Sequence, residues 1–319
     1  MAIVTLSSEM GAPGPEIGMT FAHRLNFRYV DHELISEAAR RYGLAEDRLS
    51  HLDEAKPSLF ERFDVETRRY ITVIQTVFYE FAEDDNVVLM GRGGQWLLRG
   101  IPHALRGRVM APFDFRVRRL VEDLSKQTGA RINPRSAAQM VQRDDAERSG
   151  RMRYLYEVDI RDPLLYDVTI NAEVLGTDAA VGILADLVRQ PEFARTEAGT
   201  QLVADRALAF RVQVALATNP ETRKHRITVE ARQGVVTLEG TAAEAPSAVA
   251  TVMTPPKPTA GGGRRRSGSG ARTRQGHRSP TIVAPSTRGP TRSSRRFVPS
   301  YCGGAPGTLR RRPRRDARG

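Results

Sequence analysis

The chain has 319 residues, of which 40% are hydrophobic and 6% aromatic, and a formal net charge of +12. The positive charge is concentrated near the end, because residues 257–319 contain 16 Arg and one Lys against one Asp, which leaves the preceding part mildly acidic. A single cysteine, Cys302, excludes an intrachain disulfide framework and a cysteine metal cluster. No run of about 18 apolar residues predicts a membrane span, and the first residues lack the basic start of a secretory signal, so we expect a cytoplasmic protein.

Strand-like and helical patterns alternate over residues 1–192. The first is Ile3–Leu6, an apolar run that predicts a buried strand, and Ile17, Phe21 and Leu25 then recur at helical spacing. Pro15 suits the first turn of that helix, where a missing N–H costs nothing. In chain order, the later patterns predict strands over residues 28–30, 86–90, 105–110 and 166–171, and helices over 59–83, 113–127, 134–149 and 179–188. This alternation predicts an α/β fold, with a parallel sheet and helices on both faces.

A second, smaller pattern covers residues 205–252. A helical spacing precedes two β-branched runs, 225–232 and 235–240, and the Gln233-Gly234 pair between them predicts a hairpin. The hairpin sequence resembles the first part of a BON domain, a small α+β module thought to bind membranes or other ligands, and the later part of that module is missing. We expect residues 193–204 to link this BON-like module to the first domain.

The last segment, residues 253–319, consists mainly of Arg, Gly, Pro and Ser and has few apolar residues. Such a composition buries too little surface to offset chain entropy, so we expect a disordered basic tail. One interpretation is an adaptor that binds nucleic acid or an anionic membrane surface non-specifically. Another is a shifted reading frame of a GC-rich gene, because the BON-like pattern stops abruptly.

Five ordered segments carry a family resemblance. They are the glycine turn at 7–18, the run FRYVDHELI at 27–35, VLMGRGG at 88–94, the pair Asp145 and Arg148, and the stretch from Asp162 to Asn171. No single segment is specific, but the ordered set resembles the cytidylate kinase-like family over about 190 residues. The resemblance implies a P-loop NTPase-like domain over residues 1–192 and phosphoryl transfer from ATP, with Mg²⁺, to a nucleoside monophosphate, CMP or dCMP above all.

The resemblance also implies roles for individual residues. Backbone N–H groups of a glycine loop and the helix after it bind phosphates; the residues in that place are Gly11, Ala12, Pro13, Gly14, Pro15 and Glu16. Asp31 and Arg92 follow strands and are placed like acceptor-binding residues, and Arg148, Arg151 and Asp145 are similar to catalytic residues of a lid. Each role has a structural alternative. The glycine loop can be an ordinary turn, Asp31 can cap a helix, Arg92 can be a solvated loop residue, and the lid residues can form exposed ion pairs along a helix. His residues show no metal-ligand spacing.

The glycine loop departs from the standard pattern G-x-x-x-x-G-K-[ST]. Gly14-Pro15 stands where a lysine is expected, Pro13 replaces a glycine and removes an N–H donor, and Ser8 stands where many family members carry an arginine. The loop has therefore lost positive charge and a hydrogen bond. The alternative function is that of a nucleotide-binding pseudokinase or regulator whose BON-like module contacts a protein or a membrane surface.

Overall fold

The computed structural model describes residues 2–46, 65–223, 225 and 227–240, all within one compact unit. The basic tail and the first part of the helix expected over 59–83 lie outside these residues. Among the described helices, none combines the length and apolarity that a membrane crossing requires.

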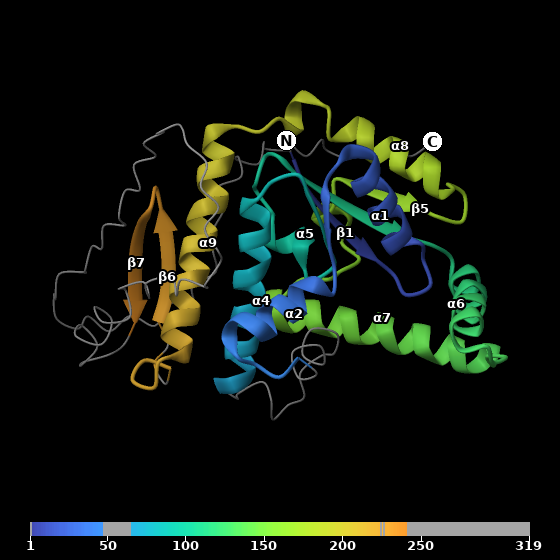
Figure 1. Ribbon diagram of the computed structural model, residues 1–319, viewed down its shortest axis with the longest axis horizontal. Coiled ribbons are helices and arrows are strands. Elements are labelled where there is room, and N and C mark those ends of the chain that lie inside the picture. Colours follow the sequence, from blue (N-terminus) through green and yellow to red (C-terminus); the bar gives the residue numbers. More distant parts are fainter. Residues whose placement is uncertain (1, 47–64, 224, 226, 241–319) are drawn as a thin grey trace, which may run out of the picture. The chain divides into compact units, whose positions relative to one another are not determined.

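The described domain is built on five parallel strands in the order β2-β3-β1-β4-β5 (Figure 1). The strands span Arg28–Val30 (β2), Val87–Met90 (β3), Ile3–Ser8 (β1), Ala104–Met110 (β4) and Val168–Asn171 (β5). All five coincide with predicted strands to within two residues. Because β1 is central, the loop that follows it lies in the middle of the carboxyl edge, where open α/β sheets bind ligands.

Helices cover both faces of the sheet, as the sequence predicts. Side chains alternate along β1, so that Ile3 packs into one apolar core and Val4 into the other. On the first face lie α2 (Glu33–Tyr42), α4 (Val65–Glu83), α5 (Gly94–Leu97) and α9 (Glu197–Thr218). On the second lie α1 (Gly14–Leu25) and α8 (Thr177–Leu187).

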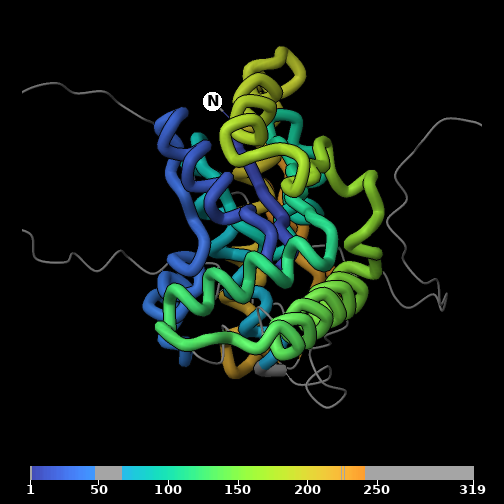
Figure 2. The backbone as a smooth tube through the Cα atoms, turned by 90° about the vertical axis from the view of Figure 1, so that its right-hand side faces the viewer, coloured from blue at the N-terminus to red at the C-terminus, as the bar shows by residue number. Residues whose placement is uncertain are grey.

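Two further helices, α6 (Phe113–Thr128) and α7 (Pro134–Tyr156), form a hairpin and lie side by side (Figure 2). The sequence predicts an end for α7 at Ser149, before Gly150, but the helix continues to Tyr156. Met152 is buried in this added part, so tertiary packing outweighs the low helix propensity of glycine.

The expected linker over residues 193–204 is instead largely helical. Thr196 caps α9 by accepting a hydrogen bond from the Gly199 N–H at 3.0 Å, so the helix begins at Glu197. The predicted hairpin forms from β6 (Ile227–Arg232) and β7 (Val235–Gly240), and Asp205 accepts hydrogen bonds from the N–H groups of Gln233 and Gly234 at its turn. The BON-like assignment of this helix and hairpin stays a prediction.

Candidate functional site

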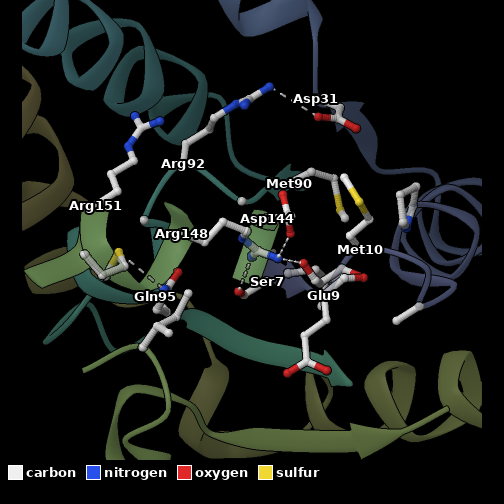
Figure 3. A pocket seen from close by; sticks show the side chains of 18 of the residues that line it. Ser7, Glu9, Met10, Asp31, Met90, Arg92, Gln95, Asp144, Arg148 and Arg151 are labelled. Carbon is white, nitrogen blue, oxygen red and sulfur yellow. Dashed lines mark hydrogen bonds and ion pairs between the residues drawn. The ribbon is translucent and has the colours of Figure 1, made fainter. Parts of the chain in front are cut away.

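A cavity of about 410 Å³ opens at the carboxyl ends of β1 and β3 (Figure 3). Its walls come from the glycine loop after β1, from the turn after β3, and from one face of α7. Asp31, after β2, lies at its edge. The fold thus brings together three segments that are far apart in the sequence.

The glycine loop is held closely by its neighbours. Gly11 has a φ of +81°, and a Cβ there would lie 2.3 Å from the Arg116 carbonyl oxygen. A Cβ on Gly14 would lie 2.1 Å from the Ser8 Oγ. Both positions therefore exclude larger residues, the first by backbone conformation and contact, the second by contact alone.

Only part of the predicted phosphate loop faces the cavity. Gly11, Ala12 and Pro15 line it, whereas Pro13, Gly14 and Glu16 do not. Glu16 turns away, accepting hydrogen bonds from Thr177 Oγ1 and Arg119 Nη2, each at 2.7 Å. These bonds lower the pKa of the Glu16 carboxyl. Its side chain is engaged with α6 and α8, so the geometry gives no support to a phosphate-binding role for it.

The turn after β3 carries Arg92 in an unusual conformation. Its φ is +57°, which a non-glycine residue seldom adopts except where surrounding structure or function requires it. The side chain is only 10% exposed, and its Nη2 lies 3.5 Å from the Asp31 Oδ1. The pKa of Arg92 is lowered to about 10. Burial is the main cause, the nearby positive charges of Arg151 and Arg148 add to it, and the negative charge of Asp31 opposes it. A site this rich in positive charge favours an anion.

Two arginines of α7 complete the positive wall of the cavity. The Arg148 guanidinium donates to the Ser8 carbonyl oxygen and, at 3.1 Å, to the Ser7 Oγ. Arg151 is buried and lines the same cavity. The predicted lid arginines and Arg92 therefore meet around one space (Figure 3).

Asp145, the predicted lid carboxylate, lies elsewhere. It accepts a bidentate hydrogen bond from Arg116 at 3.0 and 2.8 Å. It lines a second cavity of about 560 Å³ that adjoins the first, since Ser7, Glu9, Arg148 and Ile160 line both. Its neighbour Asp144 lines the main cavity instead. Successive residues of a helix point about 100° apart, so the two adjacent carboxylates reach different spaces.

Several cavity residues were missed by the sequence analysis, among them Asp144, Gln95 and Tyr156. For Asp144 a signal exists in the sequence. Asp144, Arg148 and Arg151 are separated by four and then three residues, a spacing that places all three on one helix face. Gln95 and Tyr156 carry no comparable motif.

The residues present fit a nucleotide phosphate better than an isolated metal ion. Among the residues that the structure describes, no group of three or more His, Cys, Asp or Glu side chains could hold a metal. The cavity does contain the arginines and the glycine loop that phosphates require. One buried oxygen, Asp144 Oδ2, makes no hydrogen bond in the described structure. A carboxylate oxygen of this kind is the ligand type that Mg²⁺ takes when it arrives with phosphates.

Comparison with known proteins places this site in a family. Residues 3–174 match the Cytidylate kinase-like family. One similar protein is the cytidylate kinase of Desulfurococcus amylolyticus. The two sequences are 28% identical over 155 residues, an alignment that covers 49% of this chain and 75% of that enzyme. Another is the cytidylate kinase of Staphylothermus marinus, which is 26% identical over 195 residues. That alignment covers 60% of this chain and 98% of that enzyme. A solved shikimate kinase of Bacteroides thetaiotaomicron aligns over 59% of this chain and 99% of its own, with 18% identity and a TM-score of 0.39. By the extent of the family match, this chain belongs to the cytidylate kinase-like family.

Proposed function

We propose that this chain transfers the γ-phosphoryl group of ATP to a nucleoside monophosphate and that CMP or dCMP is its preferred acceptor. The observation that carries the proposal is the meeting of Arg92, Arg148 and Arg151 in the cavity beside the glycine loop. Phosphoryl transfer is catalysed mainly by positioning two nucleotides and neutralising charge, and arginine binds phosphate in a bidentate manner. The archaeal relatives named cytidylate kinase support a cytidine acceptor.

In this proposal each residue has a position-dependent role. Arg92, held beside Asp31, binds the acceptor phosphate together with Arg151. Arg148 touches the loop itself and so lies between the two nucleotides, where it neutralises charge on the transferred group. The glycine loop, of which Gly11 and Ala12 line the cavity, receives the ATP phosphates. Mg²⁺, when bound with ATP, neutralises charge on the phosphate oxygens.

A second candidate function rests on Pro15, which lines the cavity. In the standard loop a lysine contacts the phosphates and a hydroxyl group contacts Mg²⁺. Here Gly14-Pro15 stands in place of the lysine and Glu16 stands near the position of the hydroxyl residue, so neither group is present. A chain that binds nucleotide through arginines but transfers the phosphoryl group slowly would act as a nucleotide-responsive regulator. The lid arginines decide between the two functions: in the proposed kinase, Arg148, which donates to the loop at Ser8, replaces the missing cation.

The first test is turnover of Mg²⁺-ATP by the full chain with CMP, dCMP, UMP, AMP and GMP in turn. We expect transfer to CMP or dCMP, and we expect Arg92→Ala to lower kcat/KM by about 10²–10³-fold through the loss of a preorganised cation. Arg189→Ala is the matched control, since Arg189 lies just after α8 with its side chain 64% exposed. Saturable ATP binding without turnover would support the regulatory function, and an absence of ATP binding would contradict both.

A further inference from the structure

One carboxylate in the main cavity differs from the other two that line it in the described structure. Glu9 contacts Arg108 at 2.8 Å and Arg116 at 3.5 Å. Asp31 contacts Arg92 and accepts a hydrogen bond from the Tyr29 hydroxyl at 3.3 Å. Asp144, by contrast, has a buried oxygen, Oδ2, that makes no hydrogen bond among the described residues.

Asp144 lies against the loop that should receive phosphate. Its carboxylate lines the cavity together with Met10, Gly11 and Ala12 of the glycine loop. Arg148, one helical turn further along α7, donates a hydrogen bond to the Ser8 carbonyl oxygen at the start of that loop. The Arg148 Nη1 lies 3.9 Å from Oδ2, an ion-pair distance but too long for a hydrogen bond. Burial raises the pKa of the Asp144 carboxyl, and Arg148 opposes this shift. The carboxylate therefore lies in the cavity beside the glycine loop, where a bound phosphate would also lie.

Two anions that lie close together in one cavity repel each other unless a cation lies between them. Mg²⁺ is commonly bound in just this way, by one or two protein carboxylates together with substrate phosphates. The loop supplies no hydroxyl ligand, since Glu16 stands near the position where the standard pattern provides one, and the Glu16 side chain is hydrogen-bonded to Thr177 and Arg119 instead. A ligand from the lid helix would replace it.

We propose that Asp144 is the protein carboxylate that binds the Mg²⁺ accompanying ATP, in place of the hydroxyl ligand that the loop lacks, and that it repels the nucleotide when no metal is bound. The proposal rests on the proposed function in assuming that ATP phosphates bind at the glycine loop. It assigns Asp144, rather than Asp145, as the acidic residue of the lid that touches the reacting nucleotides. It also makes nucleotide binding depend on the metal through one side chain.

The test is equilibrium binding of ATP to the full chain, in Mg²⁺ and in EDTA, for the wild type and for Asp144→Asn. For the wild type we expect Mg²⁺ to tighten binding by roughly tenfold or more, because the metal removes repulsion at a partly buried site. For Asp144→Asn we expect tighter metal-free binding and a metal effect below about threefold. Asp144→Glu, which keeps the carboxylate, should retain part of the metal effect.

Glu147→Gln is the matched control, since Glu147 lies on the same helix and pairs with Arg143 at the surface. A second readout is the electron paramagnetic resonance spectrum of Mn²⁺ in the ATP complex, whose bound signal should weaken in Asp144→Asn alone. An unchanged metal effect and an unchanged Mn²⁺ signal in Asp144→Asn would overturn the assignment. Failure of the proposed function is distinguishable, because it appears as metal-dependent ATP binding without transfer to any monophosphate.

Discussion

Ser8 and Gly14 show how one side chain restricts another within the glycine loop. The Ser8 Cβ and Oγ occupy the space into which any side chain at position 14 would project, at 2.1 Å from the place of a Cβ. Any side chain at position 14 therefore conflicts with Ser8. The glycine at position 14 and the presence of Ser8 are structurally linked.

This link predicts non-additive mutations. We expect Gly14→Ala to destabilise the fold by about 1–3 kcal/mol, as overpacking does, and Ser8→Gly in the same chain to restore much of the loss. The double-mutant cycle should give a coupling energy of roughly 0.5–3 kcal/mol, measured by urea unfolding. Gly182→Ala is the control, because nothing lies within 4 Å of a Cβ there. Equal destabilisation with and without Ser8 would contradict the steric explanation.

At the scale of elements, α9 is joined to the segment that follows the Arg92 turn. Arg206 of α9 donates to the carbonyl oxygens of Leu97 and, at 2.8 Å, Arg99, which end α5 just after the turn that bears Arg92. The Phe210 ring stacks on Tyr79 of α4 with centroids 5.0 Å apart. This helix follows residues 3–174, the part of the chain that matches the family.

We expect Arg206→Met to destabilise the fold by about 2–3 kcal/mol, because it leaves two carbonyl groups without their charged donor. Since those carbonyls hold the segment after Arg92, the KM for the acceptor should rise as well. Arg211→Met on the same helix is the control, because Arg211 pairs with Glu83 near the surface and should cost at most about 1 kcal/mol. Urea unfolding and acceptor saturation curves measure the two effects, and equal losses in both variants would refute the distinction.

The sequence predicts well the elements that are set by local hydrophobic periodicity and by the turn residues that bound them. β2 and the start of α6 coincide with their predicted bounds, and β1 differs only in length. The end of α7 differs because its packing partners come from distant segments. The start of α9 differs because Thr196 caps the helix locally, a signal that the sequence analysis did not use. Likewise, the choice between Asp144 and Asp145 depends on which face of α7 meets the loop. A motif of the form D-x-x-R does not reveal that face, whereas the full pattern of α7 does.

At the scale of the whole molecule, the basic tail remains a prediction, because residues 241–319 lie outside the described structure. Its charge contrasts with the mildly acidic remainder of the chain. Such a segment binds polyanions by releasing their counterions, independently of any site in the kinase-like domain. If a shifted reading frame encodes the tail, translation of the other frames of the gene should recover the rest of a BON-like sequence.

The adaptor interpretation predicts double-stranded DNA binding by the full chain that weakens steeply with salt. Replacing Arg264, Arg265 and Arg266 with Gln should reduce the slope of log K against log salt by roughly 2–3, one unit for each lost phosphate contact. Fluorescence anisotropy between 50 and 200 mM salt, about the range over which such contacts are lost, measures this slope. A slope that does not change would exclude these arginines as phosphate contacts.

The two prolines that flank Gly14 have a thermodynamic consequence for ligand binding. Each fixes its own φ near −65° and removes one N–H donor, so the loop has fewer conformations to lose when a ligand orders it. Nucleotide binding should therefore carry a small entropic penalty and a modest favourable enthalpy at this loop. What the loop has lost in hydrogen bonds is offset in part by rigidity already present before the ligand arrives.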